Sequence, residues 1–101
     1  MATWIIALKS RIQPPLPASI MGHFAGTLLS FIVIGTISEE TAEKLGKIMG
    51  YDRSGNIVIN VSNVRRLVLD DIPEEDKRII EEALKKIDET IDVIITKKKT
   101  P

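Results

Sequence analysis

The sequence contains an unbroken run of 27 residues without a charged side chain, from Ile12 to Ser38. Only Lys9 and Arg11 carry charge before it, whereas residues 39–101 carry 12 basic and 14 acidic residues. The zero net charge is therefore the sum of an almost uncharged N-terminal third and a densely charged remainder. Because a chain of 101 residues has room for one core of limited size, this run has to be buried by its own domain, by a partner or by a membrane.

The membrane interpretation places a single span at Leu16–Ile37, because about 20 apolar residues suffice to cross a bilayer. Three prolines crowd the start of this segment, and His23 would lie in the hydrocarbon. Strong hydrophobicity is confined to Leu28–Ile37, where β-branched residues favour a buried strand. We therefore favour a cytoplasmic protein without a membrane span and keep the single-span membrane protein as an alternative.

The residue types also restrict the chemistry that is available to the chain. There is no cysteine, which excludes disulfides, thiolate nucleophiles and cysteine-based zinc sites. His23 is the only histidine and lies in the uncharged run, so neither a paired-histidine metal site nor a Ser-His-Asp arrangement is indicated. The acidic cluster Asp70–Asp76 is explained by a helix start. We expect no catalytic residues, no metal site and no cofactor.

The choice of residue types indicates the growth temperature of the source organism. Isoleucine is the favoured apolar residue, charged residues are dense in the second part of the chain, and Gln13 is the only glutamine. These preferences are typical of thermophilic proteins. We expect a prokaryotic or archaeal thermophile.

Two helices have clear terminal signals. Ser38 is a predicted N-cap, because Glu39 and Glu40 follow it at the positive end of the helix dipole, and Gly50 is the predicted stop. The second helix is predicted from a capping box at Asp71–Glu74, with proline in its first turn, to about Thr90.

Five apolar runs are typical of strands. The longest, Thr27–Ile37, has no alternation and predicts a long central strand with both faces covered. The others are Thr3–Leu8, Ile57–Val61, Val64–Leu69 and Ile91–Thr96. For Ile91–Thr96 two further turns of the preceding helix are the alternative to a strand. Together the elements predict one α+β domain at residues 1–96, followed by a flexible basic tail at residues 97–101. Its sheet is expected to be mixed or antiparallel, with four to five strands and two main helices packed on it. The order from Thr27 to Thr96 matches a ferredoxin-like βαββαβ arrangement, with an extra N-terminal strand.

The favoured function is a small non-enzymatic interaction or oligomerisation module. The uncharged run offers more contiguous apolar sequence than one side of a small sheet readily hides, and excess apolar surface usually marks an interface. We expect the N-terminal third to join a second copy or a different protein, as a subunit of a larger assembly.

Nucleic-acid binding is a second hypothesis. The only basic concentrations are Arg65 and Arg66 and the tail residues Lys97, Lys98 and Lys99. A strand starting at Val64 beside the C-terminal strand would bring the lysines and at most one of the two arginines into one patch for a phosphate backbone, because consecutive residues of a strand point to opposite faces. No aromatic run accompanies these residues, which argues against stacking on single strands.

Overall fold

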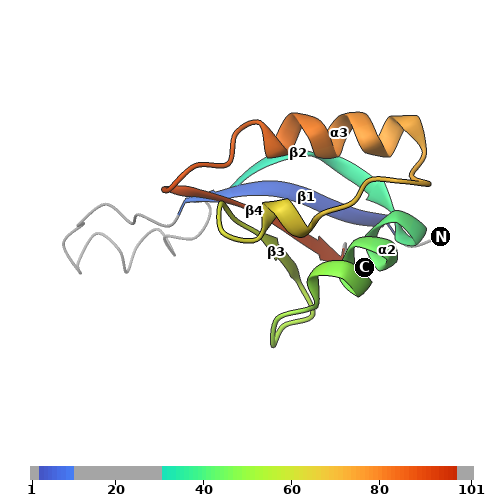
Figure 1. Cartoon of the computed structure of the whole chain (residues 1–101), viewed down its shortest axis with the longest axis horizontal. Coiled ribbons are helices and arrows are strands. Elements are labelled where there is room, and N and C mark those ends of the chain that lie inside the picture. Colours follow the sequence, from blue (N-terminus) through green and yellow to red (C-terminus); the bar gives the residue numbers. More distant parts are fainter. Residues whose placement is uncertain (1–2, 11–30, 98–101) are drawn as a thin grey trace, which may run out of the picture.

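The computed structural model describes residues 3–10 and 31–97 and builds them around one four-stranded antiparallel sheet with the order β2-β1-β4-β3 (Figure 1). The strands are β1 (Thr3–Ser10), β2 (Phe31–Ser38), β3 (Ile57–Ile59) and β4 (Ile91–Lys97). Two helices accompany them, α2 (Glu39–Met49) and α3 (Glu74–Leu84). The predicted α+β fold is confirmed, and β1 and β4 form where the sequence indicates them.

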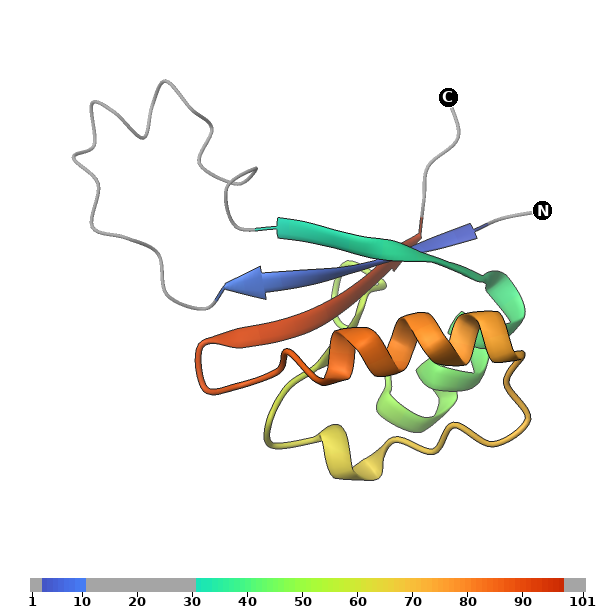
Figure 2. The same cartoon turned by 90° about the horizontal axis from the view of Figure 1, so that it is seen from above.

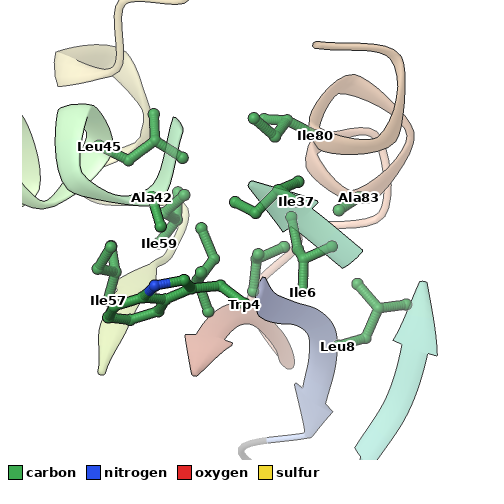
Figure 3. Close-up of a cluster of buried hydrophobic side chains, with 12 residues drawn as sticks. Trp4, Ile6, Leu8, Ile37, Ala42, Leu45, Ile57, Ile59, Ile80 and Ala83 are labelled. Atoms are coloured by element: carbon green, nitrogen blue, oxygen red, sulfur yellow. The ribbon is translucent and has the colours of Figure 1, made fainter. Parts of the chain in front are cut away.

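Both helices pack on the same face of the sheet (Figure 2). Successive residues of a strand point to opposite faces, and Trp4, Ile6 and Leu8, which share one face of β1, all join the buried cluster. Side chains of α2 and α3 meet them from above, as Figure 3 shows for Leu45 and Ile80. The intervening residues of β1 therefore point to the face that both helices leave uncovered.

Helix α2 begins and ends as the sequence predicts. The Ser38 side chain accepts a hydrogen bond from the Thr41 amide at 3.4 Å, and Glu39 and Glu40 occupy the first turn. Gly50 ends the helix with a φ of 83°, a conformation that favours glycine. The apolar side of the helix then faces the core.

Strand β2 differs most from the expectation. It pairs with β1 alone and forms one edge of the sheet, so the predicted central position is wrong. Its apolar residues are divided between the core, where Ile37 is buried, and solvent, where Ile32 and Val33 are exposed. Residues 27–30 of the predicted strand lie outside the described residues.

The segment after β3 also differs, since Val64–Arg66 forms a short 3-10 helix, η2, rather than a strand. Asn60 and Asn63 fold the chain back on itself: the Asn60 amide donates to Asn63 Oδ1 at 2.8 Å, and the Val64 amide donates to the Asn60 carbonyl at 2.9 Å. Strand β3 accordingly ends at Ile59 instead of Val61. The expected βαββαβ order needs two strands between the helices, and the described chain has one.

The second helix is shorter than predicted. Asp71 has a φ of 61°, and the N-cap residue is Pro73, with no side-chain hydrogen bond, so the predicted capping box does not form. The helix ends at Leu84, and a turn in which the Thr90 amide donates to Asp88 Oδ1 at 2.7 Å leads into β4. Apolar spacing continues past Leu84 because Ile87 and Ile91 still pack against the core without being helical.

The candidate membrane segment Leu16–Ile37 is described only from residue 31 onward, where it is strand β2. Neither helix of the described part has the length and apolar content needed to cross a bilayer.

Candidate protein interface

Among the residues that the structure describes, strand β2 has a strand neighbour on one side only, and that neighbour is β1. In an antiparallel edge strand, every second residue directs its N–H and C=O away from the neighbouring strand. Strand β2 is eight residues long and contains no charged residue and no proline. No described helix or strand lies beyond it (Figure 2). It therefore lacks two of the features that commonly prevent an edge from pairing with another chain.

The same strand carries the most exposed large apolar side chains of the described part of the chain. Ile32 is 64% exposed and Val33 is 62% exposed. They are adjacent in sequence and so point to opposite faces of the sheet. Both faces of the strand are apolar at this end, which favours a contact along the edge over a contact on one face.

A β-bulge divides the strand into two parts. Ile6 pairs with Gly35 and Ala7 pairs with Val33, so Ile34 is the extra residue of β2. Beyond the bulge, α3 approaches Gly35 closely: a Cβ on this glycine would lie 3.1 Å from the Ile79 side chain. The bulge therefore separates a part of β2 covered by α3 from the end that exposes Ile32 and Val33.

The other end of β2 is anchored by a buried carboxylate. Asp76 of α3 accepts hydrogen bonds from Ser38 Oγ at 2.8 Å, from Thr41 Oγ1 at 2.5 Å and from the Ser38 amide at 3.4 Å. Thr41 and Asp76 are the buried polar side chains of the described core, and here they satisfy each other. The cluster joins the start of α3 to the junction of β2 and α2, and its role is structural.

The sequence interpretation missed this role, because it assigned Asp76 to the acidic first turn of the helix. The available signal was spacing. Asp76 precedes Ile80 by four residues and Ala83 by seven, so it shares the inward face of α3 with these buried residues. An acid on an apolar helix face indicates a buried partner.

The uncovered face of the sheet carries Val33 as its exposed large apolar residue within the described strands. Its central residues Ala7 and Ile94 are buried, and Ile5 and Val58 are half-buried. Thr36 and Lys9 on the same face are exposed and polar. The apolar surface of the N-terminal third is thus concentrated along β2, within the described residues.

The opposite edge of the sheet is protected. Strand β3 has three residues, and its two isoleucines, Ile57 and Ile59, are fully buried. The Asn63 side-chain amide donates to the Val58 carbonyl at 3.1 Å and so satisfies a backbone acceptor of this strand. Only one of the two edges is left open and apolar.

The basic residues of the nucleic-acid hypothesis are not brought together by the expected strand. Arg65 and Arg66 are exposed on η2, whereas Lys97 ends β4, whose neighbours are β1 and β3. Figure 2 shows η2 and the end of β4 in separate parts of the molecule. Lys97 lies 3.7 Å from Glu39 as an ion pair. Lys98 and Lys99 lie outside the described residues, and nucleic-acid binding stays an untested prediction.

The described residues hold no cluster of three or more His, Asp or Glu side chains. His23 lies outside them. Comparison with known protein families, curated proteins and solved structures gives no match to this chain. The function therefore has to be argued from the fold and its surface.

Proposed function

We propose that the protein is a small non-enzymatic oligomerisation module whose copies associate through the apolar surface of the N-terminal third. The observation that carries the proposal is the exposure of Ile32 and Val33 on an uncharged strand at the edge of the sheet. The two side chains lie on opposite faces of the same strand, so the surface that supports the proposal is the edge of β2 and not one apolar face of the sheet.

Part of the apolar sequence in the N-terminal third is buried in the core of the protein itself. Trp4, Ile6 and Leu8 of β1 are part of the core and are not available to a partner. Strand β2 retains both apolar side chains and backbone hydrogen-bonding groups at the surface, and these two kinds of group together provide affinity and register. The module would act by joining subunits, as part of a homomeric or larger assembly.

The test is the mass of the protein in solution. We expect light scattering after gel filtration to give a mass above the chain mass of 11.2 kDa that rises with protein concentration. The series should extend to about 1 mM, where an association of about 4 kcal/mol is half-populated. A mass that stays at 11.2 kDa throughout the series would contradict the proposal.

A further inference from the structure

We infer that the partner of β2 is the β2 strand of a second copy, paired antiparallel across a two-fold axis into one continuous eight-stranded sheet. This inference rests on the proposed oligomerisation function and names its geometry. The strand order across the dimer would be β3-β4-β1-β2 followed by the same four strands in reverse. Because the axis is perpendicular to the sheet, the helices of both copies lie on one face.

The composition of β2 makes it compatible with its own copy. A two-fold interface brings the same residues of both copies together, so a charged strand would place like charges near one another. The segment Phe31–Ser38 contains no charge, and its exposed Ile32 and Val33 are β-branched or bulky residues that pack well across strands. Self-pairing therefore places no like charges opposite each other within the strand.

The charges at the ends of β2 are largely balanced within one copy. Glu39 forms an ion pair with Lys97 at one end, and Lys9 lies opposite Asp92 of β4 at the other end. These charges therefore do not select the direction of pairing. The antiparallel direction is favoured because parallel pairing is slightly less stable per residue.

The alternative surfaces of the described chain fit a second copy less well. Strand β3 has three residues, and Asn63 already satisfies part of its backbone. The uncovered face carries exposed Thr36 and Lys9 around a buried centre. Pairing along β2 satisfies the outward backbone groups and covers Ile32 and Val33 in one step.

Hydrogen exchange of the wild-type protein, measured residue by residue by NMR at high concentration and after dilution, tests the pairing directly. We expect every second amide of β2, those not bonded to β1, to be protected at high concentration and to lose protection on dilution. Amides bonded to β1 should keep their protection. A protein that forms oligomers by mass without this alternating pattern would overturn the β2 pairing and leave the proposed function standing. A mass of 11.2 kDa at both concentrations would overturn both.

A matched pair of variants gives a second test. Val33→Lys places two charges in the paired edge, whereas Val68→Lys makes the same change at a loop valine that is 51% exposed. We expect loss of association in Val33→Lys and wild-type association in Val68→Lys, with circular dichroism showing both to be folded. Thr36→Lys, at an exposed position of the same strand, replaces Val33→Lys if that variant does not fold. Folded β2 variants that associate as Val68→Lys does would overturn the inference.

Discussion

The two edges of the sheet are built in opposite ways. Strand β3 is three residues long, its isoleucines are fully buried, and an asparagine side chain bonds to its backbone. Strand β2 is eight residues long, uncharged, and exposes Ile32 and Val33. A sheet that is protected at one edge and has no described neighbour at the other can extend in one direction only, so the inferred pairing would close as a pair rather than grow into a fibre.

The largest expected effect compares one isoleucine from each edge. Ile57→Ala on β3 should lower the free energy of unfolding by about 2–5 kcal/mol, because it leaves a cavity at a fully buried position. Ile32→Ala on β2 should change it by less than about 0.5 kcal/mol in the dissociated protein, as expected for a surface site. Denaturant unfolding at low protein concentration measures both values. Equal losses in the free energy of unfolding for the two variants would show that the edges do not differ in burial.

The next effect concerns the anchor of β2. Asp76→Ala should lower the free energy of unfolding by about 1–3 kcal/mol, because it removes the carboxylate that accepts hydrogen bonds from the Thr41 and Ser38 hydroxyls in a largely buried cluster. Glu75→Ala, at the exposed neighbouring position, is the control and should be close to neutral. Thermal and denaturant unfolding of the two variants provide the comparison. An Asp76 variant as stable as the Glu75 variant would mean that the hydrogen-bonded cluster does not hold the junction together.

A smaller loss in the free energy of unfolding is expected when the side chain that protects β3 is removed. Asn63→Ala removes the bonds to Val58 and Asn60 and should cost about 1 kcal/mol. Ser62→Ala, one residue earlier, is the matched control. Hydrogen exchange should show faster exchange in β3 for the Asn63 variant alone. If β3 exchanges equally in both variants, Asn63 does not protect this edge.

The variant with the smallest expected effect on stability distinguishes a change in association from a change in folding. Val33→Thr keeps the shape and the strand preference of the residue and should change the free energy of unfolding by less than about 0.5 kcal/mol. It places a hydroxyl where the inferred dimer needs apolar contact, so association measured by light scattering should weaken. Unchanged association would indicate that Val33 lies outside the interface.

Local signals in the sequence predicted local structure well. Ser38 and Gly50 defined α2 correctly, because a side-chain cap and a glycine stop each act within one turn of the chain. The end of α3 was predicted too late, since no glycine marks Leu84 and the apolar spacing continues through Ile87. The capping box at Asp71 failed because matching residue types do not fix the backbone, which turns to a φ of 61° there.

The position of β2 could not be read from its residues. A continuous apolar run indicates a strand, but the strand order depends on pairings between segments far apart in the chain. Those pairings place β1 and β4 in the middle of the sheet and leave β2 at its edge, paired with β1 alone. The uncharged run predicts an apolar surface, and within residues 31–38, the part of the run that the structure describes, Ile32 and Val33 are the exposed large apolar residues.

The most direct test of the open edge is an isotope-filtered NOE experiment on a mixed sample of labelled and unlabelled protein, which detects contacts between copies only. We predict intermolecular contacts between backbone protons of β2 in one copy and β2 in the other, with none from β3. Intermolecular contacts that arise from β3 or from the uncovered sheet face, without any between the two β2 strands, would contradict the account.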